Sequence, residues 1–149
     1  MSSTASDPPA GSAFDLSTAP GHLIRRAQQM HTAIWGEVVD TGLTGVQFAV
    51  LAALETAPDL DQRTIGQRIS LDTSSLADVC RRLVERGLIE RRRDTVDTRR
   101  NLLRNTAAGS ALLARTAPQV DEVGRRLVEH LDPREQREVI ALLAKLIDL

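Results

Sequence analysis

The sequence of 149 residues has one cysteine, no tyrosine, two phenylalanines and a single tryptophan. One cysteine excludes an intramolecular disulfide, and one cysteine with three histidines argues against a structural zinc site. No apolar run reaches the length of about eighteen residues that a membrane-spanning helix needs, and the N-terminus lacks the basic-then-apolar order of a signal peptide. We therefore expect a cytoplasmic protein without a membrane segment, a metal or another cofactor, and with an aliphatic core.

Catalytic motifs are also missing. The sequence contains no GxSxG motif, no phosphate-binding P-loop and no metal-ligand spacing. His31 is the one histidine in an expected pocket, and no Ser, Cys or acidic residue has an evident triad relation to it. We do not expect an enzyme, and we predict no catalytic residues.

Lysine is nearly absent, because Lys145 is the only one and the other eighteen basic residues are Arg. Their placement is uneven along the chain. From Gln62 to Arg104 there are eleven Arg against six acidic residues, a net charge of +5, whereas the rest of the chain carries eight basic and fourteen acidic residues. A chain of net charge −1 with one strongly basic third indicates a polyanionic partner that faces this third.

The spacing of apolar and capping residues predicts a mainly helical fold. Residues 1–16, rich in Ser, Ala and Pro, are expected to be a disordered leader. Apolar residues at steps of three and four, with breaks at Gly and Pro, predict helices at about 20–42, 44–57, 61–69 and 73–87.

After Gly87 the apolar period changes. Residues 88–104 predict a small β ribbon of two or three strands around a polar tip. A long helix is then expected from Thr106 to Leu131, with Pro118 bending or breaking it, because proline removes a backbone hydrogen bond. Asp132 and Pro133 form a start signal for a last helix. The first and last helices carry wide apolar stripes, which predict a homodimer.

Residues 61–87 have the layout of a helix-turn-helix, whose second helix enters the DNA major groove with its N-terminus first. That helix opens with small hydrogen-bonding side chains, and its free N–H groups attract phosphate. A plain amphipathic helix with a solvated polar face is the alternative interpretation. The DNA contacts expected from this unit are Gln62, Thr73, Ser74, Ser75, Asp78, Arg81 and Arg82.

The ribbon beside these helices is rich in guanidinium groups, which fit a minor groove or its phosphate walls. A winged-helix module that binds a protein instead of DNA is an alternative, although such a wing has no need of five Arg between Arg91 and Arg100. The DNA contacts expected from the wing are Arg92, Arg93, Asp97, Arg99 and Arg100.

The stretch GLIERRRDTVDTRRNLLRNTAAG, residues 87–109, carries a spaced pattern of Gly-Leu-Ile-x-Arg, Asp-x-x-Asp-x-Arg and Thr-x-x-Gly. This pattern resembles the wing of the multiple antibiotic resistance regulator (MarR) family, and the run from Asp61 to Gly87 resembles the helix-turn-helix of that family. The chain departs from the family at Asn105, where Leu is usual, and at Thr98, where a basic residue or Gly is common.

The resemblance implies a winged helix-turn-helix lobe at 44–106, flanked by dimerisation helices at 17–43 and 107–149. It implies a dimeric regulator, usually a repressor, that leaves a palindromic double-stranded DNA operator when a small ligand or an oxidant acts. It also implies that Arg99 lines the minor groove and that Asp97 orients Arg99. The other interpretation of Asp97 is a turn-forming residue at the ribbon tip.

Two effector sites come into consideration. Arg25, Gln28, His31 and Trp35 share one face of the first helix, and a guanidinium, an imidazole and an indole suit a small aromatic carboxylate. The segment from Pro20 to Trp35 also resembles family members that respond to aromatic carboxylates or phenols. The alternatives are that these residues are solvated or belong to the dimer core, or that the regulator is redox-responsive through Cys80, which otherwise is a buried, inert thiol.

Overall fold

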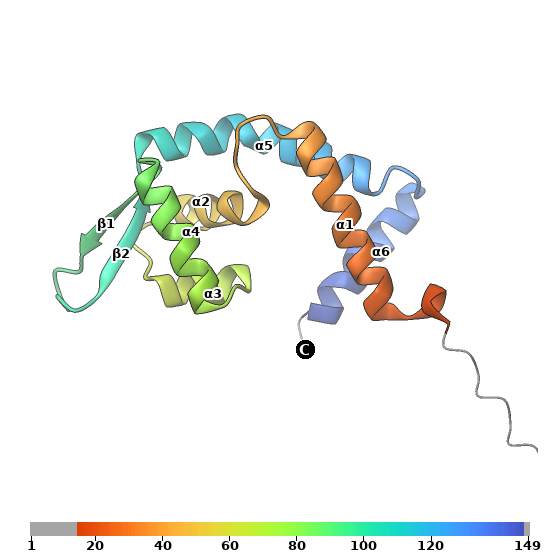
Figure 1. Cartoon of the computed structure of the whole chain (residues 1–149), viewed down its shortest axis with the longest axis horizontal. Helices are drawn as coiled ribbons and strands as arrows, with labels where there is room; N and C mark the ends of the chain where they lie inside the picture. Colours follow the sequence, from red (N-terminus) through yellow and green to blue (C-terminus); the bar gives the residue numbers. More distant parts are fainter. Residues whose placement is uncertain (1–14, 148–149) are drawn as a thin grey trace, which may run out of the picture.

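The computed structural model describes residues 15–147, and it is mainly helical with one β ribbon (Figure 1). The predicted fold class is confirmed. Residues 1–14 of the expected leader lie outside the described residues, while Asp15 caps a short 3-10 helix. The elements are η1 Leu16–Thr18, α1 Pro20–Val38, α2 Gly45–Thr56, α3 Gln62–Ile69, α4 Thr73–Glu85, β1 Ile89–Arg93, β2 Asn101–Asn105, α5 Ala107–Leu127 and α6 Pro133–Ile147.

Helix α5 connects the two halves of the molecule (Figure 1). One end of it carries a lobe made of α2, α3, α4 and the β1–β2 ribbon, and the other end lies beside α1 and α6 (Figure 1). The two strands pair antiparallel from Ile89 opposite Asn105 to Arg93 opposite Asn101. A single bridge between Leu60 and Leu103 adds a minimal third strand to the wing.

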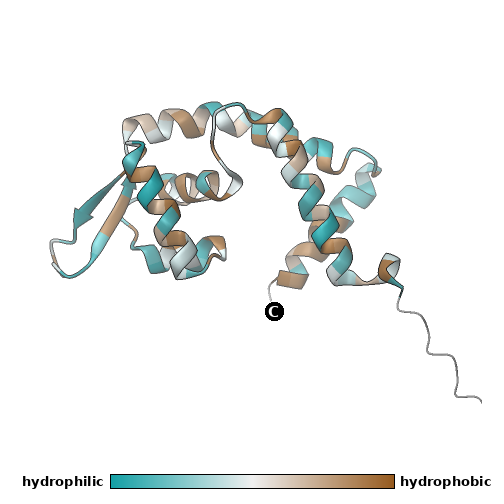
Figure 2. Ribbon diagram, viewed as in Figure 1, coloured by the Kyte–Doolittle hydropathy of each residue, from teal (hydrophilic) through white to brown (hydrophobic). Residues whose placement is uncertain are grey.

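The aliphatic core lies inside the α2–α3–α4–wing lobe. Its buried members come from every element of this lobe, and Figure 2 shows hydrophobic brown segments along these helices. Burial of these side chains is the main source of stability for such a lobe. The largest of them are Leu51, Leu54, Ile65, Leu76, Leu83, Ile89 and Leu103.

Side-chain caps fix where the helices of this lobe begin. Each cap oxygen accepts a hydrogen bond from a backbone N–H of the first turn that has no partner inside the helix. Thr44 and Gln47 form a reciprocal capping box at α2. The caps of α3, α4 and α5 are Asp61, Asp72 and Thr106.

Thr106 and Gly109 also hold the start of α5 against Gly87 and Leu88, which follow α4. The Thr106 hydroxyl donates to the Gly87 carbonyl at 2.7 Å. At Gly109 a Cβ atom would lie 2.0 Å from the Leu88 carbonyl oxygen, so only glycine allows this close approach. The Thr-x-x-Gly spacing therefore has a steric reason in this fold.

Two expected helix boundaries were wrong. Helix α1 ends at Val38 instead of near Gly42, because residues 39–44 leave the helix and Gly42 adopts a left-handed φ of 73°. Helix α5 ends at Leu127 instead of Leu131, yet it continues through Pro118 without a break. Pro118 is exposed, so water can solvate the carbonyl that loses its intrahelical partner.

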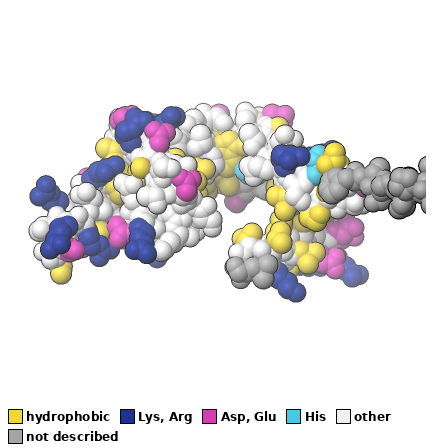
Figure 3. Space-filling model, turned by 60° about the horizontal axis from the view of Figure 1, so that its bottom comes forward, with side chains coloured by type: hydrophobic (Ala, Val, Ile, Leu, Met, Phe, Trp, Pro, Cys, Tyr) yellow, Lys and Arg dark blue, Asp and Glu magenta, His cyan; other side chains and the backbone are white. Residues whose placement is uncertain are grey.

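Helices α1 and α6 bury none of their side chains fully within the described chain. The apolar residues left exposed gather on this half of the molecule, where Figure 3 shows yellow surface on both helices. No helix of residues 15–147 combines the length and the apolar character that crossing a membrane requires. The large apolar side chains exposed on these two helices are Leu23, Ile24, Met30, Ile140, Leu142, Leu143, Leu146 and Ile147.

Candidate nucleic-acid interface and effector groove

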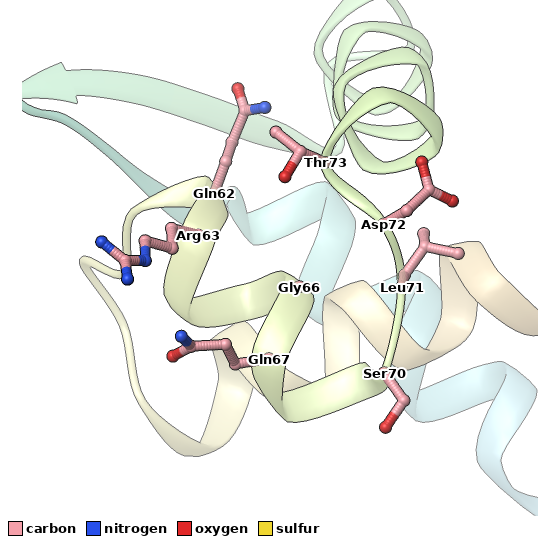
Figure 4. Close-up of a pocket in the computed structure, with 8 residues that line it drawn as sticks. All are labelled: Gln62, Arg63, Gly66, Gln67, Ser70, Leu71, Asp72 and Thr73. Carbon is pink, nitrogen blue, oxygen red and sulfur yellow. The ribbon is translucent and has the colours of Figure 1, made fainter.

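The helix-turn-helix is formed by α3 and α4 with a tight turn between them. Ser70 takes a left-handed conformation with φ 55°, and a Cβ at Gly66 would lie 2.9 Å from the Leu71 carbonyl oxygen. The turn thus brings α4 close against α3. Figure 4 shows Gln62 and Thr73 at one end of the resulting hollow, which has a volume of about 460 Å³.

The N-terminus of α4 is rigidly capped by Asp72. Its carboxylate accepts from the Ser75 backbone N–H at 2.9 Å and from the Ser74 hydroxyl at 2.7 Å. The bond from the Ser75 N–H, followed by those from the two serine side chains, holds the pKa of Asp72 far below its usual range. Ser74 therefore has a fixed hydroxyl orientation, with its oxygen lone pairs free to accept from a base or from water.

One turn further along α4, the acidic and basic side chains pair with one another. Arg81 contacts Asp78 and lies 2.8 Å from Glu85, and the Arg82 Nε atom lies 3.0 Å from Asp78. Because all four side chains are exposed, these pairs add little stability, but they orient both guanidinium groups. Asp78 is thus an arginine partner in the free protein.

The wing tip is closed by two aspartates that bind backbone N–H groups. Asp94 Oδ1 accepts from the N–H of Val96 at 2.9 Å, and Asp97 Oδ1 accepts from the N–H of Arg99 at 3.1 Å. Asp97 thus acts as a turn-forming residue. Among the described residues it has no ion pair with the Arg99 guanidinium.

Three of the four wing arginines expected to contact DNA are free to meet a polyanion. Arg92, Arg93 and Arg99 are exposed, and within residues 15–147 none has a carboxylate at ion-pair distance; the same holds for Arg91, which was not among the expected contacts. Figure 3 shows dark-blue basic side chains over this end of the molecule. These free positive charges make the wing the most direct candidate for a phosphate contact.

The fourth expected wing contact, Arg100, is placed differently. Its Nη2 atom lies 2.5 Å from Asp61 Oδ2, and its Nη1 atom lies 3.8 Å from Asp94. Arg104 forms a similar pair with Asp59, while the backbone N–H of Leu103 donates to Leu60 at 2.8 Å. Residues 59–61 therefore form a clasp that holds strand β2 and the wing base.

No local pattern in the sequence indicates this clasp, apart from the expected helix start at Asp61. The pKa of Asp61 is lowered to about 2, first by the hydrogen bonds from Thr64 and then by Arg100. The clasp neutralises two of the eleven arginines in the basic third. The wing charge that remains unpaired is carried by Arg91, Arg92, Arg93 and Arg99.

On the other side of the lobe, α1 and the loop before α2 enclose a groove of about 490 Å³. Trp35 forms its wall and donates from Nε1 to the Leu43 carbonyl at 2.8 Å. The His31 ring lies 5.8 Å from the Trp35 ring, centroid to centroid. The structure thus brings Gln28, His31 and Trp35 together as expected, and it adds Thr32 and residues 42–46.

Arg25 is not brought to this groove in the free chain. It lines neither this groove nor a second, apolar hollow that α1 forms with Leu127 of α5 and with α6, and its Nη2 atom lies 2.9 Å from His22 Nδ1. Arg25 still precedes Gln28 by three residues, so it lies one helical turn from the groove's end.

Cys80 is fully buried in the lobe core, with 0% of its surface exposed. Burial raises the pKa of its thiol to about 11, and the nearby Arg91 only partly opposes this shift. The thiol is therefore protonated and shielded at neutral pH, which disfavours the redox-responsive alternative. In the part of the chain that the structure describes, no cluster of three His, Cys, Asp or Glu could hold a metal ion.

Known proteins share this architecture and sequence. The MarR family model matches residues 41–100. The HTH-type transcriptional repressor NicR of Pseudomonas putida is 30% identical over 136 residues, which cover 91% of this chain and 86% of NicR.

Two solved structures are similar over nearly their whole length. PcaV from Streptomyces coelicolor, in complex with its natural ligand, has a TM-score of 0.87 and 41% identity, covering 92% of this chain and 97% of PcaV. BpsR from Bordetella bronchiseptica, whose DNA binding is regulated by 6-hydroxynicotinic acid, has a TM-score of 0.88 and 30% identity, covering 93% of this chain and 99% of BpsR. On this evidence the chain belongs to the MarR family of transcription regulators.

Proposed function

We propose that this chain is a homodimeric repressor that binds a palindromic operator and releases it when a small aromatic carboxylate binds. The observation that carries the DNA part is the arrangement of charge at one end of the lobe. The lobe carries unpaired arginines on its wing and an α4 N-terminus that presents small hydroxyl side chains. Such a surface combines phosphate contacts with a helix end able to reach base edges. NicR, a repressor by name, supports the same direction of regulation.

The homodimer is supported by the apolar surface of α1 and α6. A single protomer leaves this surface in contact with water, which is unusual for so wide a patch. A second copy related by a two-fold axis would cover it and would place two recognition helices about one helical turn of DNA apart. Light scattering at micromolar concentration tests this point, and a monomer there would contradict it.

The aromatic carboxylate is supported by the chemistry of the groove beside α1. Trp35 provides an apolar wall for a ring, His31 provides a hydrogen-bonding group, and Arg25 would turn from His22 to bind the carboxylate. BpsR responds to 6-hydroxynicotinic acid, which is an aromatic carboxylic acid. Arg92, Arg93 and Arg99 with Gln62, Thr73, Ser74 and Ser75 would contact the operator.

The test begins with operator selection from a random duplex library, followed by binding titrations across salt concentrations. We expect a palindromic selected site and a steep loss of affinity with salt. Addition of 4-hydroxybenzoate, 3,4-dihydroxybenzoate or 6-hydroxynicotinate should then release the duplex and raise the thermal midpoint of the protein. Failure to enrich any duplex would contradict the DNA function, and no response to any of these acids would contradict the effector class.

A further inference from the structure

The loop before α2 lies between the groove and the recognition helix. Two consecutive carbonyl groups of this loop accept hydrogen bonds from opposite sides. The Leu43 carbonyl accepts from Trp35 Nε1 at 2.8 Å, and the Gly42 carbonyl accepts from Arg86 Nη1 at 3.2 Å. Trp35 is a wall of the groove, and Arg86 is the C-terminal cap of α4. One short peptide segment thus touches both functional regions.

Arg86 has a second contact on the same side. Its Nη1 atom lies 3.3 Å from Gln47 Oε1, which also accepts from the Thr44 N–H at 3.2 Å in the capping box of α2. Gln47 is only 8% exposed, so its position is fixed by packing. Gly42 and Thr44 line the groove directly. Arg86 therefore contacts the groove wall directly at Gly42 and, through Gln47, is connected to the wall at Thr44.

Two hydrogen bonds hold the start of this loop, at Asp40 and Thr41, to helix α5. Thr116 is hydrogen-bonded to Thr41 at 2.9 Å, and Gln119 binds Asp40 at 2.6 Å. The left-handed Gly42 lies between these contacts and the capping box of α2, and Gly42 and Thr44 both line the groove. A ligand that displaces these residues would change the two contacts of Arg86 first.

We infer that Arg86 is a positioning residue that couples the state of the groove to the position of the recognition helix α4. The inference rests on the proposed function of the groove as the effector site, but the coupling exists without an effector. Because coupling is reciprocal, DNA binding at α4 should also change the position of the loop and the surroundings of the Trp35 ring. Arg86 itself needs no contact with DNA or with the ligand.

The single tryptophan allows a direct test. Trp35 emission, excited at 295 nm, is followed while the dimer is titrated with its selected operator duplex. We expect the emission of the wild type to change on DNA binding, and the change to be lost in Arg86→Met and in Arg86→Lys. Arg86→Lys keeps the charge, but its Nζ atom ends one bond short of the Nη1 atom with which Arg86 makes both contacts, so the variant separates geometry from electrostatics. Arg115→Met, an exposed arginine of α5, is the matched control and should respond as the wild type does.

The second arm measures operator affinity with and without 3,4-dihydroxybenzoate. We expect about a tenfold weakening by this acid in the wild type and less than about a twofold weakening in the Arg86 variants. The variants should still bind the acid in calorimetry and should unfold at a thermal midpoint close to that of the wild type. An unchanged Trp35 response in both Arg86 variants, or no response in the wild type, would overturn the coupling. If no aromatic acid binds, the proposed effector fails, and the Trp35 arm still decides the role of Arg86.

Discussion

Asp61, the cap of α3, forms an ion pair with Arg100 at the base of the wing, with 2.5 Å between Oδ2 and Nη2. The same carboxylate accepts from the Thr64 backbone N–H at 2.8 Å. One side chain therefore starts the first helix of the helix-turn-helix and holds the wing against it. The relative position of the two DNA-binding parts depends on this carboxylate.

Substitution Asp61→Asn should change DNA binding more than stability. Asn caps a helix about as well as Asp, so α3 should remain intact. The substitution frees Arg100 to contact a phosphate, so the slope of log affinity against log salt concentration should steepen by about 0.9 per wing. The ratio of operator affinity to random-duplex affinity should fall, because this ion pair no longer holds the wing in position against the helix-turn-helix. Salt titrations on both duplexes measure this. Arg100→Ala is the reverse control, and identical slopes in wild type and Asp61→Asn would contradict the clasp.

The Asp61 carboxyl also predicts a dependence of stability on pH. Its pKa is about 2 in the folded chain against an ordinary value of 3.8. Because the folded pKa is lowered, the stabilisation is fully present above pH 3.8 and is lost as the pH falls towards 2. Urea unfolding at several pH values should show this loss, with a shallower acid slope in Asp61→Asn. Equal acid slopes in both proteins would count against the pairing.

Substitution Arg99→Ala should weaken operator binding and flatten its salt dependence. Arg99 is exposed at the wing tip, and each lost phosphate contact reduces the salt slope by about 0.9. Arg100→Ala should have a smaller effect on the slope, because Arg100 is already neutralised by Asp61. Anisotropy titrations at four salt concentrations compare the two variants. An unchanged slope in Arg99→Ala would remove the wing from the DNA interface.

Substitution Gly109→Ala should strongly destabilise the lobe. The new methyl group would lie 2.0 Å from the Leu88 carbonyl oxygen, so α5 would have to move, at a cost of about 2–3 kcal/mol in the free energy of unfolding. Gly124→Ala in the same helix is the matched control. Nothing lies within 4 Å of that position, so it should stabilise the protein by about 0.5–1 kcal/mol. Chemical denaturation measures both, and equal stabilities would refute the close approach.

Substitution Arg25→Ala should leave operator affinity unchanged and abolish the response to 3,4-dihydroxybenzoate. Arg25 lies on α1, outside the helix-turn-helix and the wing, and its proposed role is to bind the carboxylate. Arg26→Ala, at the neighbouring exposed position, is the control for charge removal. Loss of DNA binding in Arg25→Ala would mean that the residue is structural. A response equal to that of the wild type would mean that the carboxylate binds elsewhere.

The order of the elements can be predicted from local sequence patterns, because apolar periodicity, cap residues and Gly breaks act over one or two helical turns. Helices α3, α4 and α5 begin within one residue of the predicted positions, each behind a side-chain cap. The arginine-rich ribbon after α4, and its place beside the helix-turn-helix, were also predicted correctly. The end of α1 was not, since the backbone at 39–44 is held by Trp35 and α5 rather than by its own neighbours.

Which arginines are free depends on contacts between distant parts of the chain. The partners Asp61 and Arg100 are 39 positions apart, and Gly42 and Arg86 are 44 apart. No local pattern distinguishes these guanidinium groups from Arg92, Arg93 or Arg99, because all have the same charge and reach. Packing of the 57–61 linker on β2, and of the 39–44 loop on α4, selects the arginines that are paired. The net charge of the basic third can therefore be read from the sequence. How this charge divides between internal ion pairs and free arginines depends on the fold.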